Sequence, residues 1–410
     1  MQPFDPFDDL AGDVSRAPGG GTAAGLGIGL RWHSVEAAHL DSRVLACPPP
    51  DALPPALRGL FDGDGPGALT RAFDPGELLP DWQEARMVTV PGGFFRRTQA
   101  RSRVEPRVGR FYPGLFLKGA PGLPPEAPTA FRVTAIAGDG EITVDFNHPL
   151  AGLPVDLELR LLDLVPPVEA PANVGRAAVT NGPGMQARWR GQPTDFYSGD
   201  PFARGDAGPD AEFYATPRLV QHIDDTARDR IVRLYSALLP ETGAVLDLMS
   251  SWTSHLGPEA SALRVAGLGM NAEELDANPG LQERVVHDLN SDPRLPWPDA
   301  HFDAVICTVS VEYLVRPVEV FREVRRVLRP GGRFVITFSN RWFPPKAIAL
   351  WGELHEFERV GLVLEFFLEA GGFGALNTWS LRGLPRPPQD PYADRLATSD
   401  PVYAIWGQAM

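Results

Sequence analysis

Short apolar runs alternate with helical or turn-rich segments in the second half of the chain. These runs are Val245–Leu248, Val265–Leu268, Asp303–Thr308 and Arg333–Phe338. Short apolar strands that alternate with helices are typical of a parallel sheet covered on both faces. Ligands of such sheets bind at the carboxyl ends of the strands, where the strand order reverses. We therefore expect a site in the loops after Leu248, Leu268, His287 and Thr308.

A helical period precedes these strands. Apolar residues recur at three- to four-residue steps at Ile223, Ala227, Ile231, Leu234 and Leu238. This spacing predicts an amphipathic helix that packs onto the sheet. With it, an α/β domain is predicted over residues 211–410.

The first half of the chain has a different pattern. Polar and apolar residues alternate in short runs between residues 81 and 166, as in LELRLLDLV from Leu157 to Val165. The Gly138-Asp139-Gly140 sequence between two such runs indicates a hairpin turn. We predict a flexible tail at 1–30, a β-rich domain at 31–168 and a linker at 169–210, where Pro, Gly, Ala and Asp occur without periodicity.

Composition narrows the function classes. The chain has 410 residues and a formal net charge of −14, so a surface that follows nucleic-acid phosphates is not expected. The two cysteines, Cys47 and Cys307, do not form a disulfide framework, which favours a reducing compartment. There is neither a signal-like apolar core at the N-terminus nor a run of apolar residues long enough to cross a membrane. We expect a cytoplasmic protein with a small-molecule partner, no nucleic acid and no membrane, and the oligomeric state is open.

Two strings carry a family resemblance. They are LPWPDAHFDAVICTVSVEYL and FREVRRVLRPGGRFVITF, in which a helix ends at Leu-Arg-Pro-Gly-Gly and the chain turns directly into a strand. Residues from about 211 to 407 thereby resemble class I S-adenosylmethionine-dependent methyltransferases. The resemblance implies a Rossmann-like domain with a mostly parallel seven-stranded sheet, helices on both faces and S-adenosyl-L-methionine as cofactor.

The loop after the first strand departs from this family. The family usually has L-D-x-G-x-G-x-G, whereas Met-Ser-Ser-Trp follows Leu248 here. Either the loop no longer binds the cofactor, or the hydroxyls of Ser250 and Ser251 and the N-terminus of a following helix hold the methionine carboxylate, with Trp252 in the pocket wall.

The next two loops suggest further cofactor contacts. Asn271 replaces the usual acidic ribose ligand, but it could instead cap the next helix in a capping box with Glu274. Asp288 and Leu289 match the residues that contact adenine in the family. The resemblance implies this cofactor-binding set: Asp247, Met249, Ser250, Ser251, Trp252, Gly269, Met270, Asn271, Asp288, Leu289 and Val309.

Residues on the acceptor side are less specific, because each has an ordinary structural alternative. The candidate catalytic residues are His255, Tyr313 and Asn340, and Ser310 lies beside them. The candidate substrate-binding residues are Tyr214, Arg218, His222, Glu312, Arg341 and Trp342. No His/Cys/carboxylate spacing suits a metal. Since no strong base stands out and the walls are apolar, a small thiol or hydrogen sulfide is the favoured acceptor. A protein methyltransferase and a non-catalytic chaperone or scaffold are the alternatives.

A second resemblance concerns the β-rich half. The string VDFNHPLAGLPVDLELRLLDL, from Val144 to Leu164, is similar to the C-terminal part of SlyD-like FKBP-type prolyl isomerases. It implies an FKBP-like domain, in which Phe146 and His148 could line a prolyl pocket. Alternatively, Asn147 and His148 brace a turn, and the domain serves as a scaffold or substrate gate. In the protein methyltransferase alternative, this domain presents the acceptor chain.

Overall fold

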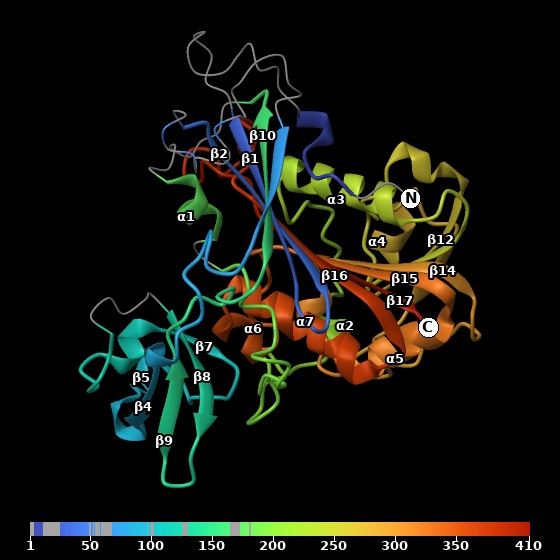
Figure 1. The fold of residues 1–410 in the computed structure, drawn as a ribbon. Coiled ribbons are helices and arrows are strands. Elements are labelled where there is room, and N and C mark those ends of the chain that lie inside the picture. Colours follow the sequence, from blue (N-terminus) through green and yellow to red (C-terminus); the bar gives the residue numbers. More distant parts are fainter. Residues whose placement is uncertain are drawn as a thin grey trace.

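The computed structural model describes residues 4–10, 25–48, 51, 53, 58, 68–96, 98–99, 102–124, 130–164, 173–179 and 182–410. Its main feature is a mixed sheet of 11 strands (Figure 1). Seven neighbouring strands come from the C-terminal half. In spatial order they are β13 (Glu283–Val286), β12 (Leu263–Gly269), β11 (Gly243–Leu248), β14 (Phe302–Thr308), β15 (Leu328–Phe338), β17 (Val402–Ala409) and β16 (Phe373–Arg382).

The strand order reverses beside β11. From β11 the chain moves outward through β12 and β13, and it then returns to β14 on the other side of β11. These four strands and β15 are parallel, whereas β17 runs antiparallel to β15 and β16. The Rossmann-like α/β arrangement predicted from the sequence is therefore confirmed. Such a reversal opens a crevice at the carboxyl ends of β11 and β14.

Helices cover both faces of these seven strands (Figure 1). One face carries α3 (Asp225–Leu238) and α4 (Ala272–Ala277), and the other carries α5 (Pro317–Val327), α6 (Ala349–Glu353) and α7 (Glu356–Ala370). Side chains alternate along a strand, so Val245 belongs to the apolar cluster that includes α3, whereas Leu246 belongs to the cluster that includes α5 and α7. The predicted amphipathic helix corresponds to α3, and its apolar stripe is buried.

Four strands from the N-terminal half extend the same sheet. They are β2 (Ala38–Ala46), β1 (Gly25–His33), β10 (Val155–Leu162) and β3 (Ala68–Phe73), and each runs antiparallel to its neighbour. Strand β2 joins β16 in parallel, with Ala38 opposite Asn377 and Arg43 opposite Arg382. The sheet thus has more than the seven strands predicted. The reason is that β16 would otherwise leave unpaired N–H and C=O groups at an open edge, and β2 pairs with them.

A smaller sheet projects from the N-terminal half. It consists of β4 (Met87–Pro91), β9 (Glu141–Asp145), β8 (Ala130–Ile136) and β7 (Phe111–Pro113), and a two-stranded ribbon of β5 (Thr98–Gln99) and β6 (Ser102–Arg103) accompanies it. The predicted hairpin at residues 138–140 joins β8 and β9. Arg110 ties this sheet to α7, because its Nε donates to the Glu358 carboxylate at 3.2 Å and both side chains are buried.

The predicted tail and linker contain ordered segments. Strand β1 already begins at Gly25, and Phe7 is buried. Helices α1 (Val174–Val179) and α2 (Asp210–Phe213) lie in or at the end of the predicted linker. Arg188 makes two bonds to Glu365 of α7, at 2.7 and 2.6 Å. Irregular backbone is held here by tertiary contacts, which leave no periodic pattern in the sequence.

The segment that resembles prolyl isomerases forms a braced turn. Phe146 is buried among aromatic rings of the small sheet, including Phe131 at 5.7 Å. His148 contacts the Val179 carbonyl through Nε2 at 2.8 Å and accepts the Leu150 N–H through Nδ1 at 3.1 Å. Phe146 therefore does not line a pocket. The FKBP-like domain stays a prediction. Within its predicted range of 31–168, most of residues 51–65 lie outside the described residues.

Candidate functional site

A cavity that is open to solvent lies at the carboxyl ends of the parallel strands, and its empty space, with the open mouth included, is about 1140 Å³. Every residue of the predicted cofactor set lines it: Asp247, Met249, Ser250, Ser251, Trp252, Gly269, Met270, Asn271, Asp288, Leu289 and Val309. It is also lined by these candidates for the acceptor side: Tyr214, Arg218, His222, His255, Ser310 and Tyr313. Residues predicted separately from several loops thus come together in one site, at the place that the strand order predicts.

Four candidates lie elsewhere. Asn340 is exposed, Arg341 lies over the Tyr392 ring at 4.5 Å, and Trp342 stacks under Arg359 at 4.3 Å. They miss the cavity because β15 ends at Phe338 and the chain then turns; it is Phe343 that reaches the cavity wall.

The fourth, Glu312, is fully buried outside the cavity. Neither carboxyl oxygen has a hydrogen-bond partner among the described residues, and burial raises the pKa of this carboxyl to about 8. A neutral acid in the core does not fit a substrate-binding role, so that prediction is wrong.

The loop after β11 passes close to the end of β12. Met249 occupies the first glycine position of the family pattern and has a φ of 59°, a left-handed conformation that costs a non-glycine residue on the order of 1 kcal/mol. The Ser250 N–H donates to the Leu268 carbonyl at 2.7 Å. A Cβ atom on Gly269 would overlap the Ser250 carbonyl. A glycine is therefore required at residue 269 in β12. In the loop, by contrast, Met249 adopts the left-handed conformation although it is not a glycine.

The two serine hydroxyls are anchored inside the protein. Ser250 Oγ donates to Asp247 Oδ2 at 2.6 Å, and Ser251 Oγ donates to Glu274 Oε2 at 2.6 Å. Burial raises the pKa of Asp247 to about 6, and the bonds from Ser250 and Ser254 partly offset this rise. The predicted helix after the loop is wrong, because the chain runs without helix as far as the 3₁₀ turn Pro258–Ala262. The serines therefore shape the loop.

Asn271 connects the start of α4 to residues 214 and 215, in the segment that covers the cavity. Its Oδ1 accepts the Glu274 N–H at 3.1 Å, which caps α4, and its Nδ2 donates to the carbonyls of Tyr214 and Ala215. The expected capping box is incomplete, since the Glu274 carboxylate instead binds Ser251 and the Arg218 N–H at 2.7 Å. The amide of Asn271 thus has structural partners at both ends.

Asp288 also caps a turn. Its carboxylate accepts the Asn290 N–H at 2.9 Å and the Ser291 hydroxyl at 2.6 Å. Asn290 then connects three segments, because it donates to Asp210 Oδ2 and to the Tyr313 carbonyl and accepts the Val315 N–H. Sequence reasoning missed Asn290.

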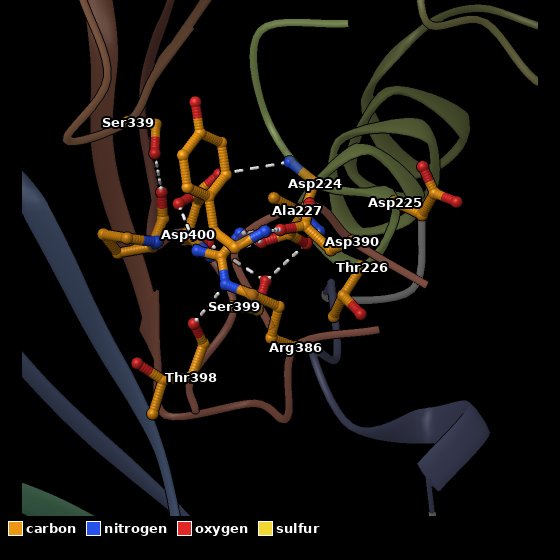
Figure 2. Close-up of polar contacts among 12 residues, drawn as sticks. Asp224, Asp225, Thr226, Ala227, Ser339, Arg386, Asp390, Thr398, Ser399 and Asp400 are labelled. Atoms are coloured by element: carbon orange, nitrogen blue, oxygen red, sulfur yellow. Dashed lines mark hydrogen bonds and ion pairs between the residues drawn. The ribbon is translucent and has the colours of Figure 1, made fainter. Parts of the chain in front are cut away.

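Residues 210–224 form the segment that covers the cavity, and buried ion pairs hold both ends of this segment. At residue 210, the Asp210 carboxylate binds Arg204 at 2.6 Å and Lys346 at 3.1 Å, and Lys346 is fully buried. At the start of α3, Asp224 accepts the Ala227 N–H and, with Asp400, faces Arg386 (Figure 2). The Arg386 guanidinium lies 2.5 Å from Asp400 and 3.3 Å from Asp224. These contacts fix the cavity wall between residues 210 and 224.

Aromatic and histidine side chains line the part of the cavity where the sequence predicted the acceptor. Tyr313 stacks on Phe343 with centroids 6.0 Å apart, and its hydroxyl accepts the Phe343 N–H at 2.9 Å. His222 meets the same ring edge-to-face at 5.1 Å. Burial lowers the pKa of His222, and it lowers that of His255 to about 4. Both imidazoles are thus neutral at pH 7 and are weak proton acceptors.

Glu274 and Asp210 also line the cavity but were not predicted as site residues. Glu274 had a signal, since it follows the cap residue Asn271 by three. Asp210 had none, because only long-range contacts bring it there. Among the described residues, no cluster of three His, Cys, Asp or Glu could hold a metal ion, and no helix is long and apolar enough to span a membrane.

The fold and the cavity define a Rossmann-like domain with a ligand site at its topological switch point. Comparisons with known proteins show what this domain is similar to. Residues 250–336 match a family model described as a methyltransferase domain. Over 77 residues the chain is 38% identical to the demethylmenaquinone methyltransferase of Deinococcus radiodurans. The matched stretch is 17% of this chain and 30% of that protein. Over 116 residues it is 28% identical to a ubiquinone/menaquinone biosynthesis C-methyltransferase of Chromobacterium violaceum, covering 28% and 47%.

The chain thus spans less than half the length of these curated relatives. Solved structures similar to this one include a putative methyltransferase from Bacillus halodurans, with 14% identity, 43% of this chain and 96% of that one covered, and a TM-score of 0.31. Another is the geranyl diphosphate C-methyltransferase of Streptomyces coelicolor, solved with S-adenosyl-L-homocysteine, with 14% identity, coverages of 45% and 81%, and a TM-score of 0.31. The family match and the curated relatives support a methyltransferase domain in the C-terminal half.

Proposed function

We propose that this protein is an S-adenosylmethionine-dependent methyltransferase that acts on a small-molecule acceptor. The observation that carries the proposal is the single cavity at the switch point, lined by every residue assigned to the cofactor from the sequence.

The residues present fit the cofactor. The Met249 turn and Gly269 let the loop backbone lie tightly over the end of β12, as close approach to a ribose and a methionine requires. Asp288 and Leu289 lie at the end of β13, where an adenine ring would bind. Ser250 and Ser251 hold the loop through Asp247 and Glu274 and are not themselves the main ligands. This favours a substituted loop over a lost site.

The chemistry asks the protein mainly for alignment. The bound cofactor supplies an electrophilic methyl group on a sulfonium, whose leaving group is neutral. The aromatic wall of Tyr214, Tyr313 and Phe343 positions an acceptor and excludes water. His255 and His222 are poor bases because burial lowers their pKa. An acceptor that ionises easily is therefore favoured, and a thiol with an ordinary pKa of about 8.5 meets this requirement.

The first experiment is calorimetric titration with S-adenosylhomocysteine, followed by methyl transfer from S-adenosylmethionine to a panel of thiols including hydrogen sulfide, phenols and amines. We expect micromolar binding and turnover of thiols. Asn340→Ala is a matched control, because this exposed residue lies outside the cavity. Absence of binding would refute the methyltransferase assignment. Turnover confined to oxygen or nitrogen acceptors would refute the thiol, and methylation of protein alone would replace the small molecule with a protein acceptor.

A further inference from the structure

Arg218 has an unsatisfied donor group at the cavity. Its backbone N–H is bound to Glu274, and its Nη2 donates to the Phe213 carbonyl at 3.0 Å. The Nη1 atom is buried and has no hydrogen-bond partner in the part of the chain that the structure describes. The residue lines the cavity. A buried donor atom without a partner is costly unless a ligand completes it.

The surroundings of this guanidinium are aromatic. It lies over Phe213 at 4.6 Å, Phe343 at 5.6 Å and Tyr214 at 5.7 Å, measured to the ring centroids. Rings on several sides reduce its access to water, and a charge-assisted bond in such a site is stronger than one in solvent.

Acidic residues near Arg218 are bound to other groups. The Glu274 carboxylate accepts from Ser251 and from the Arg218 backbone, not from its guanidinium. The Asp210 carboxylate is paired with Arg204 and Lys346. Two further titratable neighbours are neutral at pH 7: burial raises the pKa of the Tyr214 phenol and lowers the pKa of the His222 imidazole. The positive charge of Arg218 therefore has no counter-ion among these neighbours.

The guanidinium lies on the acceptor side of the cavity. Phe343 follows β15 and stacks on Tyr313, which follows β14. The cofactor loops lie on the other side, at Ser251 and Glu274, where Arg218 is held through its backbone. The side chain thus extends from the cofactor loops toward the acceptor.

We propose that Arg218 is the anion-binding residue of the acceptor site and that the acceptor is a small molecule carrying a carboxylate. This inference rests on the proposed function, which it makes more specific. The planar guanidinium forms directional bonds to a carboxylate, which an ammonium group or a neutral donor does not reproduce. A neutral amide of the same size can accept from Nη1 through its carbonyl oxygen, but it has neither the negative charge nor the second acceptor oxygen of a carboxylate and binds more weakly.

The test compares matched ligands on the complex with S-adenosylhomocysteine. Calorimetry measures Kd for 3-mercaptopropionate and propionate against 3-mercaptopropionamide and propionamide. We expect the carboxylates to bind at least tenfold more tightly. Arg218→Gln should abolish this preference, Arg218→Lys should restore part of it, and Arg322→Gln on the surface should not change it. In all variants, Kd for S-adenosylhomocysteine should stay within about threefold.

The outcomes separate the two proposals. If the wild type does not bind S-adenosylhomocysteine, the proposed function fails. If S-adenosylhomocysteine binds but carboxylates and amides bind equally, only the anion site is refuted. If Arg218→Gln weakens S-adenosylhomocysteine more than tenfold and leaves the ligand preference unchanged, Arg218 holds the cofactor's own carboxylate and the proposal is overturned. Circular dichroism of each variant shows whether the fold is retained.

Discussion

Gly269 at the end of β12 provides the sharpest test of the cofactor site. In Gly269→Ala, the added methyl group would overlap the Ser250 carbonyl oxygen and lie 3.2 Å from its carbonyl carbon and from Leu275 Cδ2. Strand β12 is held between β11 and β13, so the loop at Ser250 must move instead. Such a shift stretches the bond from the Ser250 N–H to the Leu268 carbonyl, now 2.7 Å.

The size of the effect follows from these contacts. The overlap in the binding-competent loop costs about 1–3 kcal/mol, as overpacking by one methyl group does. A displaced loop avoids this overlap but weakens one hydrogen bond, which offsets about 0.5–1.5 kcal/mol of the relief. The binding-competent loop is therefore disfavoured by about 1–2 kcal/mol, and since about 1.4 kcal/mol corresponds to a factor of ten, Kd for S-adenosylhomocysteine should rise by about 5- to 30-fold.

Calorimetry measures this Kd, and thermal unfolding checks that the variant is folded. Gly352→Ala is the control, because no described atom lies within 4 Å of a Cβ placed on that helical glycine, and neither its stability nor its Kd should worsen. An unchanged Kd in folded Gly269→Ala would refute the reasoning. It would show that the loop position does not govern cofactor binding.

Three further predictions concern backbone strain, a buried acid and the Arg386 network. At φ 59°, Met249→Gly should keep Kd for S-adenosylhomocysteine within about threefold, whereas β-branched Met249→Val should weaken it tenfold or more; equal values would contradict the strain argument. Folded Glu312 has a pKa of about 8, above its usual 4.5, so its contribution to stability falls as pH rises through this window. The unfolding free energy of Glu312→Gln relative to wild type, measured by thermal unfolding, should therefore rise by about 2–4 kcal/mol from pH 5 to pH 8, with methyl transfer unchanged. A stability difference that does not change with pH would contradict the raised pKa. Arg386→Met leaves Asp224 and Asp400 without their buried cation and should lower the unfolding free energy in urea by about 3–5 kcal/mol, and a loss below 1 kcal/mol would show that the pair is not coupled to folding.

The positions of the residues assigned to the cofactor could be predicted from the sequence because local pattern and strand order determine them together. Apolar runs define β11, β12, β14 and β15, and parallel strands place their carboxyl ends at one edge. The roles of the polar residues were harder to predict. A serine or asparagine in a loop can serve a ligand or the backbone, and only the distances show that Ser250, Ser251 and Asn271 bind within the protein.

The sequence alone determined the α/β class of residues 211–410, the amphipathic α3, the hairpin at 138–140 and the edge of the sheet where the cavity lies. Periodicity and turn chemistry act over a few residues, so they can be read directly. Tertiary structure decided the rest. Three features join residues that are far apart in the chain: the pairing of β2 with β16, the ion pair of Asp210 with Lys346, and the position of Phe343 in the cavity wall. Such contacts depend on which edges and charges the folded chain brings together, and no local pattern records them.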